Sequence, residues 1–173
     1  SFDQLKGDTV EAGTSRRIIL SSIAFVLGFT TVFVGLGATV HTSKREIAAD
    51  DFFTGLFETA LAEDEIVTAV AFPVPEKAAY AKFANPASRY AMAGVFVARL
   101  NDGAVRVAVT GASGDGVFRA HDIERALSED WSAAAIEPLT VSPEGMLSDI
   151  HGSAAYRANL VKVMAKRAVA AAC

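Results

Sequence analysis

The stretch AAYAKFANPASRYAMAGVFVARLNDGAVRVAVTGA, residues 78–112, decides the fold of this chain. It begins as a strand, breaks around Asn85 and Pro86, and continues as an apolar stretch that ends at Asn-Asp-Gly, residues 101–103. Such a turn between apolar runs is a strong hairpin signal. In the returning strand the residues alternate, which is typical of a half-buried strand. The valines of one face are Val105, Val107 and Val109, with Arg106 and Ala108 on the other face.

A long helix is expected near the end of the chain. Residues 148–169, SDIHGSAAYRANLVKVMAKRAV, begin as a loop, and Ser153 can cap the helix that follows. Tyr156, Leu160 and Met164 recur at helical spacing and form an apolar stripe. We expect this stripe to pack on the sheet and close the domain, while the basic residues of the helix face water or a partner.

The order of the elements indicates the fold class. A strand is expected within residues 65–74, a short helix over 119–131, and connecting chain up to the final helix. Strands that are followed by helices favour an α+β fold in which an antiparallel β-sheet carries helices packed on one face.

An apolar run precedes this region. Residues 18–40, IILSSIAFVLGFTTVFVGLGATV, hold no charge over 23 positions. A bilayer core of ~30 Å needs roughly 20 apolar residues in a helix. The run therefore favours a transmembrane helix, which would associate the chain with a membrane. Its glycines and β-branched residues also allow a buried segment of a globular domain, and both alternatives stay open.

Composition excludes several kinds of site. A net charge of −4 gives no reason to expect nucleic acid as a partner. The single cysteine, Cys173, cannot form a disulfide within the chain, and iron–sulfur clusters need about four cysteine ligands. The three histidines are far apart in the sequence and lack the spacing of metal ligands. We therefore predict no metal site here, and any transition-metal chemistry must belong to a partner.

Two polar motifs have plain interpretations. TGASGDG, residues 110–116, could approach a phosphate but has neither the Walker lysine nor the dinucleotide spacing, so a strand-to-helix loop is favoured. Asp50 and Asp51 could form an acid/base pair. Beside Phe52 and Phe53, which begin a run near helical spacing, they are better explained as a helix start, where carboxylates are favoured.

Lys82 and Tyr90 flank the break at Pro86 and could lie at one sheet edge. An ammonium can hydrogen-bond a ring carbonyl, and a phenol ring can lie against a flat π system. The plainer alternative, an exposed strand lysine and a core tyrosine, is favoured by the residues alone.

Several stretches resemble one family. Residues 37–75 resemble the end of the flavin-binding domain in medium subunits of the carbon monoxide dehydrogenase group, within the xanthine dehydrogenase family. YAKFANPASRYAMAGVFVARL, VRVAVTGA and DIHGSAAYRANLVKVMAKRAV resemble the C-terminal domain of that subunit. The resemblance covers roughly residues 36–169, and the last motif is the most specific.

The resemblance implies a cytoplasmic flavoprotein. FAD would pass electrons between an iron–sulfur small subunit and a molybdenum-cofactor large subunit, where the substrate is oxidised, and an acceptor. In that family a lysine and an aromatic residue of the C-terminal domain lie close to the isoalloxazine. Lys82 and Tyr90 match those positions, and Arg89 is a weaker neighbour.

The chain also departs from the family. Neither glycine-rich stretch that grips the FAD pyrophosphate is found, and residues 1–39 instead resemble a transmembrane segment of the cytochrome c biogenesis thiol-electron transporters. We therefore expect three parts: an apolar segment over 1–40, the incomplete end of a flavin-binding domain over 41–75, and the C-terminal domain over 76–173.

These parts predict a fragment or fusion form of an FAD-binding medium subunit that is inert alone. Two alternatives remain, a non-enzymatic docking module and a membrane-anchored domain of a cytochrome c biogenesis protein.

Overall fold

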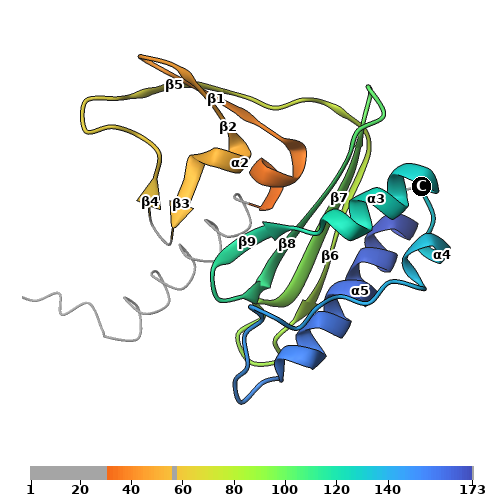
Figure 1. Ribbon diagram of the computed structural model, residues 1–173. Helices are drawn as coiled ribbons and strands as arrows, with labels where there is room; N and C mark the ends of the chain where they lie inside the picture. The colour runs from red at the N-terminus through yellow and green to blue at the C-terminus, as the bar shows by residue number, and fades with distance from the viewer. Residues whose placement is uncertain (1–30, 56–57, 173) are drawn as a thin grey trace, which may run out of the picture.

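The computed structural model describes residues 31–55 and 58–172. Its largest element is a four-stranded antiparallel sheet in the order β6-β7-β8-β9 (Figure 1). The strands are β6 (Pro75–Ala84), β7 (Ala91–Leu100), β8 (Val105–Ser113) and β9 (Gly116–Arg119). The break after residue 84 and the Asn-Asp-Gly turn both join neighbouring strands, as the sequence predicts.

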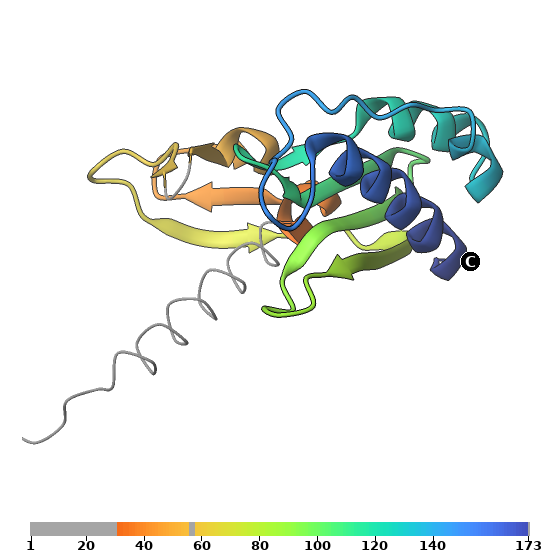
Figure 2. The same cartoon turned by 90° about the horizontal axis from the view of Figure 1, so that it is seen from below.

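Helices cover one face of this sheet, which confirms the predicted α+β fold (Figure 2). They are α3 (His121–Glu129), the short α4 (Ala133–Ile136) and α5 (Ala154–Ala171). The predicted valines Val105, Val107 and Val109 are buried in the core beneath α5. Burying a valine or leucine side chain fully contributes about 1.5–3 kcal/mol, so this layer accounts for much of the stability of the domain.

Helix α5 begins as predicted, because the Ser153 hydroxyl accepts a hydrogen bond from the Tyr156 N–H at 3.2 Å. Leu160 and Met164 are buried on the sheet, whereas Tyr156 is 42% exposed at the margin. The prediction that the basic residues of α5 face water or a partner is wrong for Arg157, which is only 4% exposed. Its guanidinium can be buried because two backbone carbonyls and a carboxylate accept hydrogen bonds from it.

A smaller unit lies against the opposite face of the sheet (Figures 1 and 2). It contains a three-stranded antiparallel sheet in the order β2-β1-β5 and a two-stranded sheet. Its elements are β1 (Thr39–Thr42), β2 (Glu46–Ala48), α2 (Ala49–Phe52), β3 (Phe53–Gly55), β4 (Glu58–Thr59) and β5 (Val67–Ala71). It has its own core, which includes Phe33, Val40, Ile47 and Phe52.

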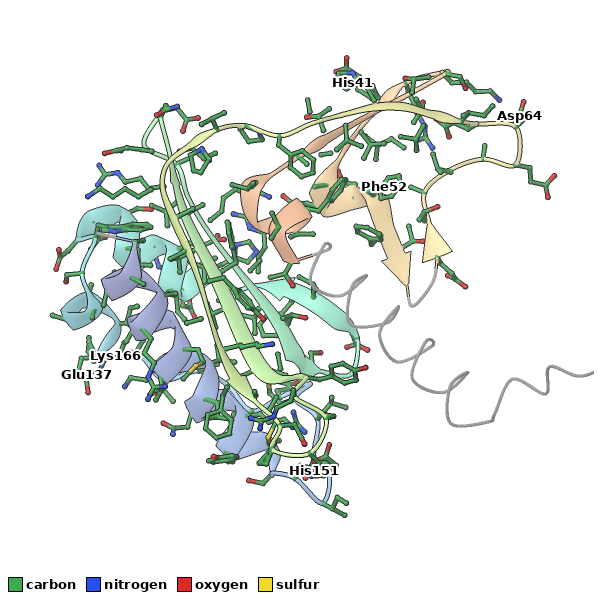
Figure 3. All side chains as sticks on the ribbon, turned by 180° about the vertical axis from the view of Figure 1, so that it is seen from behind. His41, Phe52, Asp64, Glu137, His151 and Lys166 are labelled. Atoms are coloured by element: carbon green, nitrogen blue, oxygen red, sulfur yellow. The ribbon has the colours of Figure 1, made fainter. Side chains whose placement is uncertain are left out.

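Helical spacing around Phe52 is a poor guide here. α2 ends at Phe52, and Phe53 already begins β3, while residues 56 and 57 of that predicted run lie outside the described residues. Phe52 and Phe53 instead pack edge to face at 5.0 Å around Phe33, so the aromatic core determines the local structure (Figure 3).

The apolar run 18–40 lies mostly outside the described residues. Within its described part, residues 31–36 are helical, but Thr39 and Val40 belong to β1. No helix among the described residues is long and apolar enough to cross a membrane. At its end, therefore, the run supplies a strand and core residues of the smaller unit.

The glycine-rich motif at 110–116 is not a strand-to-helix loop. β8 continues through Ser113, and a tight turn at Gly114 and Asp115 returns the chain as β9. Gly111 and Gly116 have φ angles of 76° and 102°, which bend the two strands where other residues would be strained.

Candidate functional site

The turn between β6 and β7 has a defined internal structure. The Asn85 N–H donates to the Tyr90 carbonyl at 2.7 Å, and the Arg89 N–H donates to the Asn85 carbonyl at 2.9 Å. The Asn85 side-chain oxygen accepts from the N–H groups of Ala87 and Ser88 at 2.9 and 3.1 Å. Asn85 is buried and thus organises the whole turn, which we call the 85–90 hairpin loop.

This loop brings the three predicted site residues together. The exposed Lys82 ammonium donates to the Arg89 carbonyl at 3.4 Å. Arg89 immediately precedes the half-buried Tyr90 in the chain. Arg89 has a φ of 64°, which is the one positive value at a non-glycine residue in the described part of the chain. Such backbone conformations are costly and gather at functional sites. The hairpin thus presents a cation, an aromatic ring and a strained backbone at one end of the sheet.

The sheet face next to the loop adds residues that sequence reasoning missed. Strand register places Lys82, Gly94 and Thr110 in one row across β6, β7 and β8, and Tyr80 in the next row. A Cβ atom at Gly94 would overlap the Tyr80 hydroxyl and come within 2.9 Å of the Thr110 methyl. Gly94 therefore leaves the space that the Tyr80 ring occupies.

The environment of this row is unusual for a sheet surface. Burial raises the pKa of the Tyr80 phenol. The buried hydroxyl oxygen of Thr110 has no hydrogen-bond partner among the residues that the structure describes. In the sequence, Gly94 inside an otherwise apolar strand could have indicated that another group approaches the backbone closely at that position. The tyrosine that uses the space could not be identified without the strand register.

A second polar cluster joins the smaller unit to the sheet. The Asp50 carboxylate accepts from Arg106 Nη2 at 2.6 Å and from Arg119 Nη1 at 3.1 Å. Arg106 also donates to the Val34 carbonyl at 3.1 Å. Asp50 lies in the first turn of α2, as predicted, and its carboxylate is paired with arginines rather than arranged with Asp51 as an acid/base pair.

Behind that cluster, Glu124 of α3 is nearly fully buried. Its carboxylate accepts from the Val107 N–H and from Arg119 Nε, both at 2.8 Å, and Nδ1 of His121 lies 3.0 Å away. Burial lowers the pKa of Arg119, but the hydrogen bonds and charges of Glu124 and Asp50 outweigh it and raise that pKa. The cluster is a structural ion-pair network that holds α3, β8 and β9 together.

Other sites are sparse in the described residues. No group of three or more histidine, cysteine, aspartate or glutamate side chains there is arranged to hold a metal ion. A groove of about 430 Å³ lies between β9, the start of α3 and residues 139–146, with Phe118, Leu139 and Met146 among its lining. His151 lies in the exposed loop before α5, in a turn closed by Asp149 and Gly152 (Figure 3).

Comparison with known proteins identifies relatives, although no family model matches the chain. The nicotine 6-hydroxylase medium subunit of Paenarthrobacter nicotinovorans is 39% identical over 138 residues, covering 73% of this chain and 47% of that protein. The glyceraldehyde dehydrogenase medium chain of Sulfolobus acidocaldarius is 30% identical over 153 residues, covering 79% of this chain and 53% of that protein.

Solved structures agree with these sequence relatives. Quinoline 2-oxidoreductase from Pseudomonas putida 86 matches with a TM-score of 0.63 and 26% identity, over 83% of this chain and 54% of that chain. Reconstituted CO dehydrogenase from Oligotropha carboxidovorans matches with the same TM-score and identity, over 83% of this chain and 55% of that one.

The chain thus spans about half the length of the curated relatives it matches. The separate resemblance of residues 1–39 to a cytochrome c biogenesis segment receives no support, and residues 1–30 lie outside the described part. On these relatives and structures, the chain belongs to the medium-subunit family of the carbon monoxide dehydrogenase and xanthine dehydrogenase type.

Proposed function

We propose that this chain supplies the ring-facing part of an FAD-binding medium subunit in a molybdenum hydroxylase. The observation that carries the proposal is the 85–90 hairpin loop, which holds Lys82, Arg89 and Tyr90 together in a member of this family. An ammonium and an aromatic ring carried by one hairpin suit a flat ligand that has carbonyl acceptors and a π face.

The donor set fits one part of FAD. An exposed ammonium and a half-buried phenol ring are suited to the isoalloxazine. The described glycine-rich segments serve other purposes: a Cβ at Gly37 would lie 2.8 Å from Arg106, and one at Gly111 would overlap the Ala91 carbonyl. Lys82, Arg89 and Tyr90 support a place for the ring, whereas Gly37 and Gly111 do not support a cradle for the two phosphates within residues 31–55 and 58–172.

The residues would act on the ring as follows. When bound, FAD supplies the reversible acceptance and release of electrons. The Lys82 ammonium would donate a hydrogen bond to a ring carbonyl and would stabilise negative charge there. Tyr90 would shield the ring from water, and Arg89 would add positive charge nearby.

The wider assignment follows from the relatives. The names medium subunit and medium chain indicate multi-subunit enzymes. We infer as partners an iron–sulfur small subunit and a molybdenum-cofactor large subunit, and we infer a cytoplasmic location on the same resemblance. The two separate cores support a division near residue 75, between the end of a flavin-binding domain, predicted over 41–75, and a C-terminal domain over 76–173. The first core begins earlier than that prediction, because it also includes Phe33 and Val40.

The chain alone is expected to be colourless and catalytically inert. A charge-assisted hydrogen bond contributes roughly 1.5–3 kcal/mol, and every ~1.4 kcal/mol changes a dissociation constant tenfold. If the chain lacks the several bonds of a phosphate cradle, as residues 31–55 and 58–172 suggest, FAD should bind it many orders of magnitude more weakly than it binds a subunit that has one.

An FAD titration followed by amide NMR tests the proposal. We expect weak, saturable shifts at Lys82, Arg89 and Tyr90, and at least a tenfold weaker response in Lys82→Ala. Lys77→Ala is the matched control, because Lys77 lies on the same strand beside Arg99, near the opposite end. Shifts confined to other residues, or equal loss in both variants, would refute the assignment. Tight stoichiometric binding would show that a phosphate cradle is present after all.

A further inference from the structure

Helix α5 begins beside the candidate site, at the motif DIHGSAAYR of residues 149–157. This motif offers no nucleophile or metal ligand set of its own, yet its side chains reach both strands of the 85–90 hairpin. The Tyr156 ring packs edge to face on Phe83 of β6, with ring centroids 6.4 Å apart. Arg157 reaches β7, where its Nη1 donates to the Met92 carbonyl at 2.9 Å.

Arg157 forms hydrogen bonds at the point where the pairing of β7 and β8 ends. The β7–β8 ladder ends at the pair Gly94 and Thr110, because Gly111 has a φ of 76° and approaches the Ala91 carbonyl too closely for a side chain. Nη1 of Arg157 also donates to the Gly111 carbonyl at 3.1 Å. One guanidinium nitrogen therefore bonds both strands in the place of a ladder hydrogen bond, two residues after Tyr90.

Asp149 fixes the guanidinium in turn. Its Oδ2 accepts from Arg157 Nη2 at 2.7 Å, and its Oδ1 accepts from the N–H groups of His151 and Gly152 at 2.9 and 3.2 Å. Those contacts, the His151 N–H first and Arg157 next, hold the pKa of the Asp149 carboxyl below its usual value. The Arg157 side chain is 5% exposed and that of Asp149 is 42% exposed, so the guanidinium is shielded from water while the carboxylate lies at the surface.

We propose that Asp149 and Arg157 are positioning residues, which fix the 85–90 hairpin loop and so the Lys82–Tyr90 pair. The flavin part of this inference rests on the proposed function. The mechanical part does not, because the contacts between α5 and the hairpin exist without a ligand.

Hydrogen exchange of the 173-residue chain without flavin tests the mechanical part. The amides of Asn85 and Arg89 report on the hairpin loop, and those of Leu100 and Gly103 report on the turn at the opposite end of the sheet. We expect Arg157→Gln to speed exchange at the first pair at least tenfold relative to the second. Arg157→Lys should give an intermediate value, since a lysine keeps the charge but not the forked geometry.

Two variants separate positioning from general loss of stability. Asp149→Asn alters an outer carboxylate, should fold normally, and should speed exchange at the loop by a smaller factor. Leu160→Ala weakens the core one turn further along α5 and should leave the ratio between the two pairs unchanged. An unchanged ratio in both Arg157→Gln and Asp149→Asn would overturn the proposal.

An FAD titration of the same variants tests the flavin part. We expect the shift at Tyr90 to weaken about tenfold in Arg157→Gln but not in Leu160→Ala. Equal weakening in both would show that Arg157 acts only through stability and would overturn the positioning role. A third outcome is also informative: the variants exchange faster at the loop, but the unmodified chain shows no response to FAD. That result would uphold the positioning role of Asp149 and Arg157 and refute the proposed function.

Discussion

Replacement of Glu124 should reveal how much the buried ion-pair network stabilises the protein. The Glu124 side chain is 9% exposed and accepts from the buried Val107 N–H and twice from Arg119. Glu124→Gln keeps one acceptor for Val107 but loses the charge opposite Arg119. Hydrogen bonds to charged groups contribute about 1.5–3 kcal/mol, so we expect a loss of that size. Arg119 retains Asp50 as a partner, which limits the effect.

Glu124→Ala should be more destabilising, by about 3–5 kcal/mol, because the Val107 N–H and part of the Arg119 charge lose their partner inside the protein. Urea unfolding followed by circular dichroism measures both values. Glu129→Gln is the control, since Glu129 lies on the same helix and is exposed. If Glu124→Gln unfolds within 0.5 kcal/mol of the unmodified chain, roughly the spread of neutral surface changes, the network contributes little and this reasoning is wrong.

Three further predictions concern the two cores and the site. Hydrogen bonds from Arg45, and then from Thr42 and Ala62, lower the pKa of Glu65 to about 2 in the folded protein. The stability that this carboxylate contributes is complete above the pKa of Glu65 in the unfolded chain, and it should be lost as the pH falls from there through about 2. Acid titration should show this step, and Glu65→Gln should remove it. Gly94→Ala should cost about 1–3 kcal/mol by overpacking against Tyr80; an unchanged urea midpoint would contradict this. Leu160→Asp should cost at least the roughly 2–5 kcal/mol of truncation to alanine, so an unchanged melting temperature would refute the packing.

Local signals account for the parts of the fold that the sequence predicts well. The alternating valines of β8, the Asn-Asp-Gly turn and the Ser153 cap each depend on residues within a few positions of one another. The proximity of Lys82 and Tyr90 is of the same kind, because Lys82 lies near the end of β6 and Tyr90 ends the 85–90 hairpin loop that follows it.

Tertiary contacts account for the parts that the sequence does not predict. Phe53 leaves the expected helical run because Phe33, which is far away in the sequence, offers an aromatic contact at 5.5 Å. Tyr80 lies two residues before Lys82 on β6, but its approach to the space at Gly94 depends on the pairing of β6 with β7. A buried Arg157 cannot be distinguished by spacing from an exposed one, since its acceptors come from β7, β8 and the preceding loop.

The spacing of the motif DIHGSAAYR follows from helix geometry once its contacts are known. Ser153 is the N-cap of α5, and the Arg157 N–H donates to the Ser153 carbonyl at 3.0 Å. Arg157 therefore lies one helical turn after the cap. Side chains in a helix tilt toward its N-terminus, which directs the guanidinium back over that first turn. Asp149 lies the same distance before the cap, where the turn through Gly152 returns its carboxylate to the guanidinium. Tyr156, one position earlier on the helix, is rotated by about 100° and meets β6 instead of β7. This run of residues is thus constrained at Asp149, Gly152, Ser153, Tyr156 and Arg157, because each of them fixes backbone or ring contacts at the end of the sheet where Lys82 and Tyr90 lie.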